Sequence, residues 1–262
     1  MTTEIFTRPN GTFLNVEYIA GKDDTKPGIV YLHGLLSSMK SKKGRYLKAF
    51  AKAHGLSYLC CDFTAHGNSW GKPDDFLIGR CLNDAKDILS RYTKAPQIIV
   101  GSSMGGWIGL LLCQQVPEKV AAFVGLAAGA DFTKFIWDHL LTDDHKAALK
   151  SGATLGPNEE TKGYCFTYQM FLDAAENYVL TKKIDYTGVV RLICGDQDQL
   201  VPYQTSFHIK DVLTSSDVQI TCIKGGDHSL SSFAHLGIIG NVLEGILKQN
   251  DNVEFAAKAL DN

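Results

Sequence analysis

The chain has 262 residues, and its 26 Lys and Arg against 28 Asp and Glu give a formal net charge of −2. This length suffices for one large domain with a well-buried core, and 45% hydrophobic with 21% charged residues is an ordinary globular composition. The balanced charge excludes a general electrostatic attraction to nucleic acid or to an anionic membrane. No run approaches the ~18 apolar residues of a membrane span.

The N-terminus and the cysteines bear on the cell compartment and on metal binding. Residues 1–4 lack the basic patch and apolar core of a signal peptide. Most of the seven cysteines lie in apolar runs, as reduced thiols do. We therefore expect a cytoplasmic protein. No CxxC or HExxH spacing occurs, so neither a metal site nor a cofactor is predicted.

Apolar runs of strand length alternate with amphipathic segments, a rhythm typical of α/β proteins with a mostly parallel sheet flanked by helices. Strands are predicted at Ile5–Arg8 and Phe13–Ala20 (a hairpin), Gly28–Leu32, Ser57–Asp62, Gln97–Gly101, Val120–Leu126, Val189–Cys194 and Val218–Ile223. Helices are predicted at Arg45–His54, Asp75–Arg91, from the strand end at Gly101 through Gln115, and at Phe207–Leu213 and Leu236–Gln249. The last dozen residues are predicted to form a weak polar helix or a frayed tail.

The alternation breaks between Asp131 and Tyr186, where the sequence is helical in tendency and contains no convincing strand. We predict one domain over residues 1–262, in which about 131–186 form a small helical lid over the strand ends. Apolar lid residues either line an acyl pocket or form the lid's own core. These residues are Phe132, Phe135, Ile136, Trp137, Leu140, Phe166, Tyr168 and Phe171.

The segment 101–105 contains the pattern G-x-S-x-G, with Ser103 at its centre. Only this register fits, because Ser102 would need a glycine at Val100. A sharp turn from strand to helix forces the serine into an uncommon backbone conformation, and side chains two places away would collide. An apolar strand before the turn and a helix after it are the context that the motif requires. Ser103 is therefore the predicted nucleophile.

A serine nucleophile needs a base that a carboxylate orients, and in enzymes with this turn both partners follow the serine in the chain. His228 follows the last predicted strand by a short loop, whereas His208 falls inside a predicted helix and His235 directly precedes another. We predict His228 as the base. For the acid, Asp196 and Asp198 both follow the strand Val189–Cys194, and we favour Asp198, which lies deeper in the loop.

Two backbone N–H groups must face the carbonyl oxygen as it becomes charged. We predict that Met104, directly after the nucleophile, and Leu35, in the loop after the strand Gly28–Leu32, donate them. His33 in that loop is interpreted as a brace rather than as a base. Asp62 and His66 are interpreted as supports of the next loop.

A run of basic residues follows the Leu35 loop. Two interpretations stay open: a solvated helix face, or a landing patch for an acidic substrate such as a phosphopantetheine thioester. The run comprises Lys40, Lys42, Lys43, Arg45 and Lys48.

Five segments, HGLLS, DFTAHGNS, GSSMGGW, GDQDQLVP and GDH, resemble the α/β-hydrolase superfamily in unbroken order and span nearly the whole chain. Within it, the chain is most similar to the abhydrolase-domain subgroup typified by the mitochondrial acyl-protein thioesterase that also cleaves acyl glucuronides. The supporting stretches are Gly101–Trp107, Pro117–Val120 and Ile184–Pro202. The resemblance implies a triad of Ser103, Asp198 and His228 and an acyl substrate.

The function that we predict is hydrolysis of a carboxylic ester or thioester through an acyl-enzyme intermediate, on a small molecule or an acyl-protein. A peptidase or amidase with the same triad is the alternative within enzymes. A non-catalytic binding protein is the alternative from another class. The sequence does not predict the acyl group or the oligomeric state.

Overall fold

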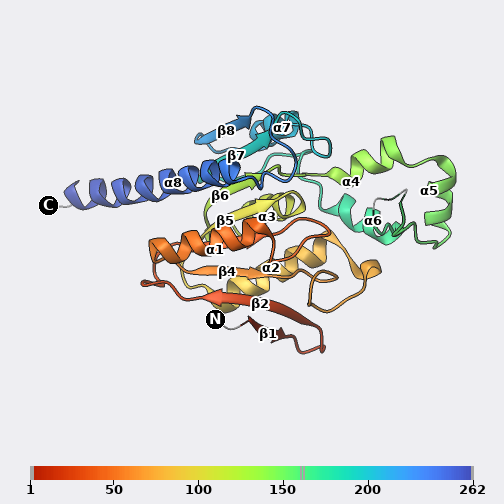
Figure 1. Cartoon of the computed structure of the whole chain (residues 1–262), viewed down its shortest axis with the longest axis horizontal. Coiled ribbons are helices and arrows are strands. Elements are labelled where there is room, and N and C mark those ends of the chain that lie inside the picture. The colour runs from red at the N-terminus through yellow and green to blue at the C-terminus, as the bar shows by residue number, and fades with distance from the viewer. Residues whose placement is uncertain (1–2, 160, 162, 261–262) are drawn as a thin grey trace.

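A computed structural model describes residues 3–159, 161 and 163–260, with side chains as far as Gln249. Within these residues the chain forms an eight-stranded sheet in the order β1-β2-β4-β3-β5-β6-β7-β8 (Figure 1). The strand β2 pairs antiparallel with β1 and β4, and the other pairs are parallel. The predicted mostly parallel sheet is confirmed. The strands are β1 (Thr3–Thr7), β2 (Phe13–Ile19), β3 (Ile29–Leu32), β4 (Tyr58–Cys61), β5 (Gln97–Ser102), β6 (Val120–Leu126), β7 (Val189–Gly195) and β8 (Val218–Ile223).

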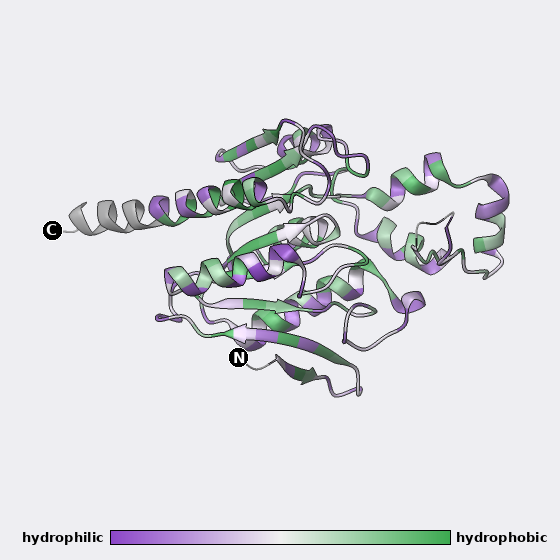
Figure 2. Cartoon of the chain, in the orientation of Figure 1, coloured by the Kyte–Doolittle hydropathy of each residue, from purple (hydrophilic) through white to green (hydrophobic). Residues whose placement is uncertain are grey.

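Helices cover both faces of this sheet and enclose two hydrophobic cores. One core packs α1 (Lys42–His54) and α8 (Phe233–Leu260) against the strands. The other packs α2 (Ile78–Tyr92), α3 (Met104–Gln115) and α7 (Gln204–Val212) against the opposite face. The hydrophobic residues concentrate in the strands and on the sheet-facing sides of the helices (Figure 2). Among the described helices, none combines the length and the apolar character needed to cross a membrane.

Several helix boundaries differ from the prediction. The helix α1 begins three residues early, at Lys42, because the Ser41 side chain caps it by accepting from Gly44 N (3.2 Å). The helix α2 begins at Ile78 rather than Asp75, since Pro73–Asp75 form a 3-10 turn that ends in extended backbone at Phe76. The helix α7 begins at Gln204 rather than Phe207. The helix α8 begins at Phe233 and continues to Leu260, and residues 261–262 lie outside the described part.

The predicted helical insertion projects from the strand ends at one side of the molecule (Figure 1). It contains α4 (Phe132–Phe135), a π-helical turn (Ile136–Leu140), α5 (Asp143–Lys150) and α6 (Tyr168–Glu176). An isolated β-bridge joins Leu155 to Phe166.

Asp131 fastens the two ends of the insertion together. Its backbone is left-handed, with φ of 55°, and its buried carboxylate accepts hydrogen bonds from the N–H groups of Val179 (2.9 Å) and Leu180 (2.9 Å). The chain therefore leaves the sheet and returns to it at one point.

Candidate active site

Ser103 occupies the sharp turn between β5 and α3, with φ of 53° and ψ of −118°. Such a conformation costs a non-glycine residue about 1–3 kcal/mol and persists only where the surroundings impose it. The two motif glycines are required by space. A Cβ at Gly101 would lie 2.3 Å from the carbonyl oxygen of Gly105, and one at Gly105 would lie 2.0 Å from that of Leu32. The turn thus presents the Ser103 hydroxyl at the carboxyl end of the parallel strands.

A continuous chain of hydrogen bonds joins the three predicted triad residues. His228 Nε2 lies 3.0 Å from Ser103 Oγ, and His228 Nδ1 lies 2.7 Å from Asp198 Oδ2. The other carboxylate oxygen of Asp198 accepts from the N–H groups of Leu200 (2.8 Å) and Val201 (2.9 Å). Because a carboxylate can only accept, His228 Nδ1 carries the imidazole proton and donates a hydrogen bond to Asp198. His228 Nε2 is then free to accept from the Ser103 hydroxyl.

The alternative acid and bases lie elsewhere. Asp196 accepts from the N–H of Gly225 (2.6 Å), so it ties the loop after β7 to the turn after β8. Asp196 therefore braces a turn that follows a different strand. His208 lies in α7 and lines a cavity, and His235 lies in α8. Among the described residues, no hydrogen bond joins either histidine to Ser103.

The two predicted oxyanion donors lie on either side of Ser103. A Cβ at Gly34 would lie 3.2 Å from Ser103 Cβ, so the loop that carries Leu35 touches the turn that carries Met104. Neither the Leu35 N–H nor the Met104 N–H donates a hydrogen bond within the described chain. Backbone donors left free beside a nucleophile are available to a developing oxyanion.

His33 is a brace, as the sequence predicts. The fully buried ring accepts from Phe63 N–H at Nε2 (3.1 Å), so Nδ1 carries the proton and donates to the carbonyl of Gly34 (2.8 Å). Asp62 supports the same region by accepting from Met39 N (2.9 Å) and Asn68 N (3.0 Å). These contacts hold the Leu35 loop in place.

We expect His33 to make folding sensitive to acid. Burial, followed by the neighbouring His66, holds the pKa of His33 well below its ordinary value. Below the unfolded-state pKa of about 6.5, the imidazole of the unfolded chain therefore binds a proton, whereas that of the native chain does not. The free energy of unfolding consequently decreases as the pH is lowered. Urea titrations give the decrease in the free energy of unfolding between pH 7.5 and pH 5. In His33→Gln this decrease should be smaller than in wild type by on the order of 1–2 kcal/mol. Equal falls in wild type, His33→Gln and the exposed-site control His139→Gln would contradict this expectation.

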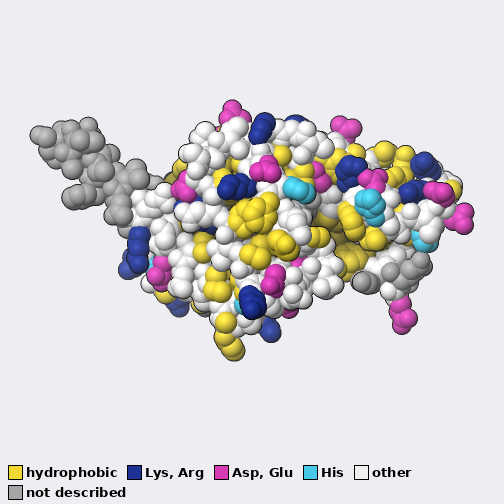
Figure 3. Space-filling view, turned by 90° about the horizontal axis from the view of Figure 1, so that it is seen from above, with side chains coloured by type: hydrophobic (Ala, Val, Ile, Leu, Met, Phe, Trp, Pro, Cys, Tyr) yellow, Lys and Arg dark blue, Asp and Glu magenta, His cyan; other side chains and the backbone are white. Residues whose placement is uncertain are grey.

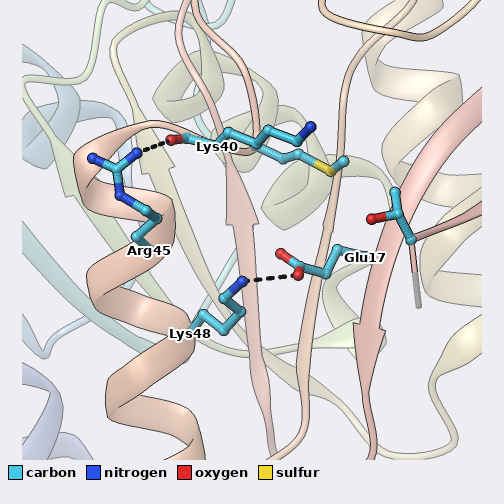
Figure 4. A pocket seen from close by; sticks show the side chains of 6 residues that line it. Glu17, Lys40, Arg45 and Lys48 are labelled. Carbon is cyan, nitrogen blue, oxygen red and sulfur yellow. Dashed lines mark hydrogen bonds and ion pairs between the residues drawn. The ribbon is translucent and has the colours of Figure 1, made fainter. Parts of the chain in front are cut away.

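The basic run does not form one solvated face. Lys43 is 8% exposed and turns inward, on the side of α1 that also carries Leu47 and Phe50. Arg45 and Lys48 lie on the other side, where they line a small cavity of about 250 Å³ with Lys40 and Glu17 (Figure 4). Lys48 is paired with Glu17 at 2.9 Å. Sequence reasoning missed the inward Lys43, although its spacing of four and seven residues from Leu47 and Phe50 could have revealed it.

A large cavity of about 1040 Å³ opens at Ser103, between the sheet and the insertion. Leu35, Ser103 and His228 lie at its base, and its wall is mostly apolar. Seen from above, hydrophobic side chains gather where the insertion meets the main body of the molecule (Figure 3). A long apolar group attached to a reacting carbonyl therefore has a place to bind.

The apolar residues of the insertion divide between the two expected roles. Trp137 packs against Tyr168 and Phe171, with ring centroids 5.8 and 4.9 Å away, and the three form a small core for the insertion. The others line the cavity: Phe132, Phe135, Ile136, Leu140 and Phe166.

Comparisons with known proteins identify the family of the chain. The model of the alpha/beta hydrolase fold family matches residues 27–151. Mouse "Palmitoyl-protein thioesterase ABHD10, mitochondrial" is 33% identical over 227 residues, which cover 86% of this chain and 76% of that protein. The rat protein of the same name is 30% identical over 240 residues, covering 91% and 80%. The solved structure of mouse alpha/beta hydrolase domain-containing protein 10 has a TM-score of 0.85 at 30% identity, covering 95% of this chain and 99% of that one.

These relatives contradict the expected cytoplasmic location, because they are named as mitochondrial proteins. That expectation was wrong because it relied on the missing secretory signal and on buried thiols, and neither feature distinguishes one reducing compartment from another. The fold, the length of the match and the identity agree: the chain belongs to the alpha/beta hydrolase fold family and is similar within it to ABHD10.

Proposed function

We propose that this hydrolase is a serine esterase or thioesterase that acts through an acyl-enzyme, with Ser103 as nucleophile, His228 as base and Asp198 as the residue that orients it. The observation that carries the proposal is the hydrogen-bonded chain from Ser103 through His228 to the buried Asp198, at the base of an apolar cavity. This arrangement supplies an activated hydroxyl beside a binding site for an acyl chain.

In the first half of the reaction, Ser103 Oγ attacks the acyl carbonyl while His228 Nε2 takes its proton. The carbonyl oxygen becomes an oxyanion, which the N–H groups of Leu35 and Met104 stabilise. When the tetrahedral intermediate collapses, the C–O or C–S bond breaks and His228 returns the proton to the departing alcohol or thiol. Asp198 stabilises the imidazolium that forms in between.

The second half repeats these steps with water. His228 removes a proton from a water molecule that attacks the acyl carbon, the oxyanion forms again in the same place, and the carboxylic acid leaves as Ser103 regains its proton. The acid, base and oxyanion donors therefore serve both halves of the reaction.

The cavity and the relatives together favour a long acyl group. The apolar wall of the insertion suits a hydrocarbon chain. The relatives are named as palmitoyl-protein thioesterases, which supports a thioester of a fatty acid, on a small molecule or on a protein, as the substrate class.

A chain-length series tests this proposal. Each methylene buried in the cavity contributes about 0.8 kcal/mol, so kcat/KM should rise roughly fourfold per methylene until the cavity is full. The series comprises p-nitrophenyl esters and matching acyl thioesters from acetyl to palmitoyl, with acyl-amides and peptides alongside. Cleavage of peptides but of no acyl ester or thioester would favour the peptidase alternative, and no cleavage at all would favour the binding protein.

A variant locates the acyl chain. Leu155 lines the cavity, so Leu155→Trp should fill part of it and lower the preference for long over short chains at least tenfold, with acetyl ester hydrolysis retained. The control is Leu172→Trp on α6, a site that is 45% exposed and outside the cavity. Equal chain-length profiles for both variants would place the acyl chain elsewhere.

A further inference from the structure

Lys43 joins the first turn of α1 to the loop that carries His228. Its ammonium donates a hydrogen bond to the main-chain carbonyl of Ser229, the residue directly after His228. The side chain has little contact with solvent, since Lys43 is 8% exposed. A lysine in this position is unusual, because a buried cation is costly where an apolar residue of similar shape would pack at less expense.

The first turn of α1 is a rigid support for this contact. Tyr58 on β4 donates to the carbonyl of Gly44 (3.1 Å), and the capping Ser41 is bonded to Tyr31 on β3 (3.1 Å). The loop before the helix packs directly against this turn, because a Cβ at Gly44 would lie 2.2 Å from the carbonyl oxygen of Met39. Lys43 is therefore anchored to the sheet through its own backbone.

The loop after β8 is held in a strained form. Leu230 is fully buried with φ of 45°, a left-handed conformation that a leucine adopts only under constraint. On one side the Asp227 carboxylate accepts from Leu230 N (3.1 Å) and from Ser229 Oγ (3.0 Å). On the other side Lys43 holds the Ser229 carbonyl. The backbone of His228 thus lies between two fastened points.

We propose that Lys43 is a positioning residue for His228, which fixes the imidazole at hydrogen-bonding distance from Ser103 by holding the Ser229 carbonyl. This inference rests on the proposed role of His228 as the base. Lys43 would thus contribute to catalysis without contacting the substrate. Its role differs from that of Lys40, Arg45 and Lys48, which lie on the other side of α1.

The proposal predicts a loss of activity at alkaline pH. Burial lowers the pKa of Lys43 to about 8, while the charge of Asp227 raises it. His235 in turn lies near Asp227. Below pH 8 the ammonium is charged and holds the carbonyl firmly, and above pH 8 a neutral amine holds it less strongly. The rate should therefore fall as the pH rises through about 8.

The test compares Lys43→Met, Lys43→Arg and the control Lys52→Met, an exposed site on the same helix, with a short neutral ester as substrate. We expect Lys43→Met to lower kcat by roughly 10- to 100-fold with KM within about twofold, because a displacement of ~1 Å at a catalytic group costs about that much. Lys43→Arg keeps a cation that does not titrate, so it should recover most of kcat and lose the alkaline fall. Lys52→Met should match wild type.

Each outcome decides the proposal. A kcat for Lys43→Met within twofold of wild type would overturn it. Equal losses of kcat in Lys43→Met and Lys43→Arg, with both variants keeping the wild-type pH profile, would overturn it as well. If Lys43→Met does not fold, judged by circular dichroism, the pH profile of Lys43→Arg decides alone. Ser103→Ala, measured in parallel, separates the two hypotheses: full activity in that variant refutes the proposed function, whereas an inactive Ser103→Ala with an unaffected Lys43→Met refutes only the role of Lys43.

Discussion

Ser103→Ala is expected to abolish reaction with a fluorophosphonate probe and to lower kcat by on the order of 10⁵- to 10⁶-fold, the loss seen when a triad serine is removed. Alanine keeps the turn but removes the only atom that can form the acyl-enzyme. Some rate above that in water should remain, because the N–H groups of Leu35 and Met104, which we propose as the oxyanion donors, are unchanged in this variant. Gel fluorescence after probe treatment measures the first effect, and ester hydrolysis the second.

The neighbouring Ser102→Ala is the matched control. Ser102 ends β5, one residue before the turn, and is almost as buried as the strand around it. Its alanine variant should keep probe labelling and a rate within a few-fold of wild type. Labelling that persists in Ser103→Ala, or that disappears in Ser102→Ala, would contradict the assignment of the nucleophile.

Asp198→Asn is expected to lower kcat, and with it kcat/KM, by about 10⁴-fold, the loss in kcat that this change causes in a Ser-His-Asp protease. The amide presents an N–H where the carboxylate accepts from His228 Nδ1, so the imidazole proton moves to Nε2. That nitrogen can then no longer accept the proton of Ser103. The hydrogen bonds to Leu200 and Val201 can remain, because the amide oxygen still accepts them, so the loop should keep its shape.

Asp196→Asn is the control for this prediction, because Asp196 lies two residues away and accepts only from Gly225 N among the hydrogen bonds of the described chain. An asparagine oxygen can still accept that bond, so a change of less than about tenfold is expected. The ratio of kcat/KM between the two variants measures which aspartate orients the base. A larger loss in Asp196→Asn would reverse the assignment.

The sheet and the order of the site residues were predictable because both are local properties of the chain. Val189–Gly195 and Val218–Ile223 are short apolar runs, and the loop after each is only a few residues long. Residues that follow parallel strands must meet at one edge of the sheet, so the sequence places Asp198 and His228 near Ser103 without any knowledge of distances.

Features that depend on contacts between distant segments were not predictable in the same way. The spacing of Lys43 indicates which face of α1 it shares, but its contact on that face, with the Ser229 carbonyl 186 residues later, is not visible in the sequence. The roles of the insertion's aromatic residues depend on which of them face the sheet, and a helical pattern does not specify this. The predicted start of the second helix at Asp75 was also wrong, because a 3-10 turn that begins at Pro73 replaces the first turn of that helix.

The hydrogen bonds of Asp131 to Val179 and Leu180 bear on how enzymes of this fold diversify. Because residue 131 is bonded to residues 179 and 180, the segment between them can be exchanged for one of different length or composition without moving the strands on either side. The entropy of closing a loop changes only slowly with its length, so the exchange has a small effect on folding. Evolution, or a protein engineer who grafts the segment from a relative, can then change the lining of the cavity while the residues around Ser103 are inherited intact.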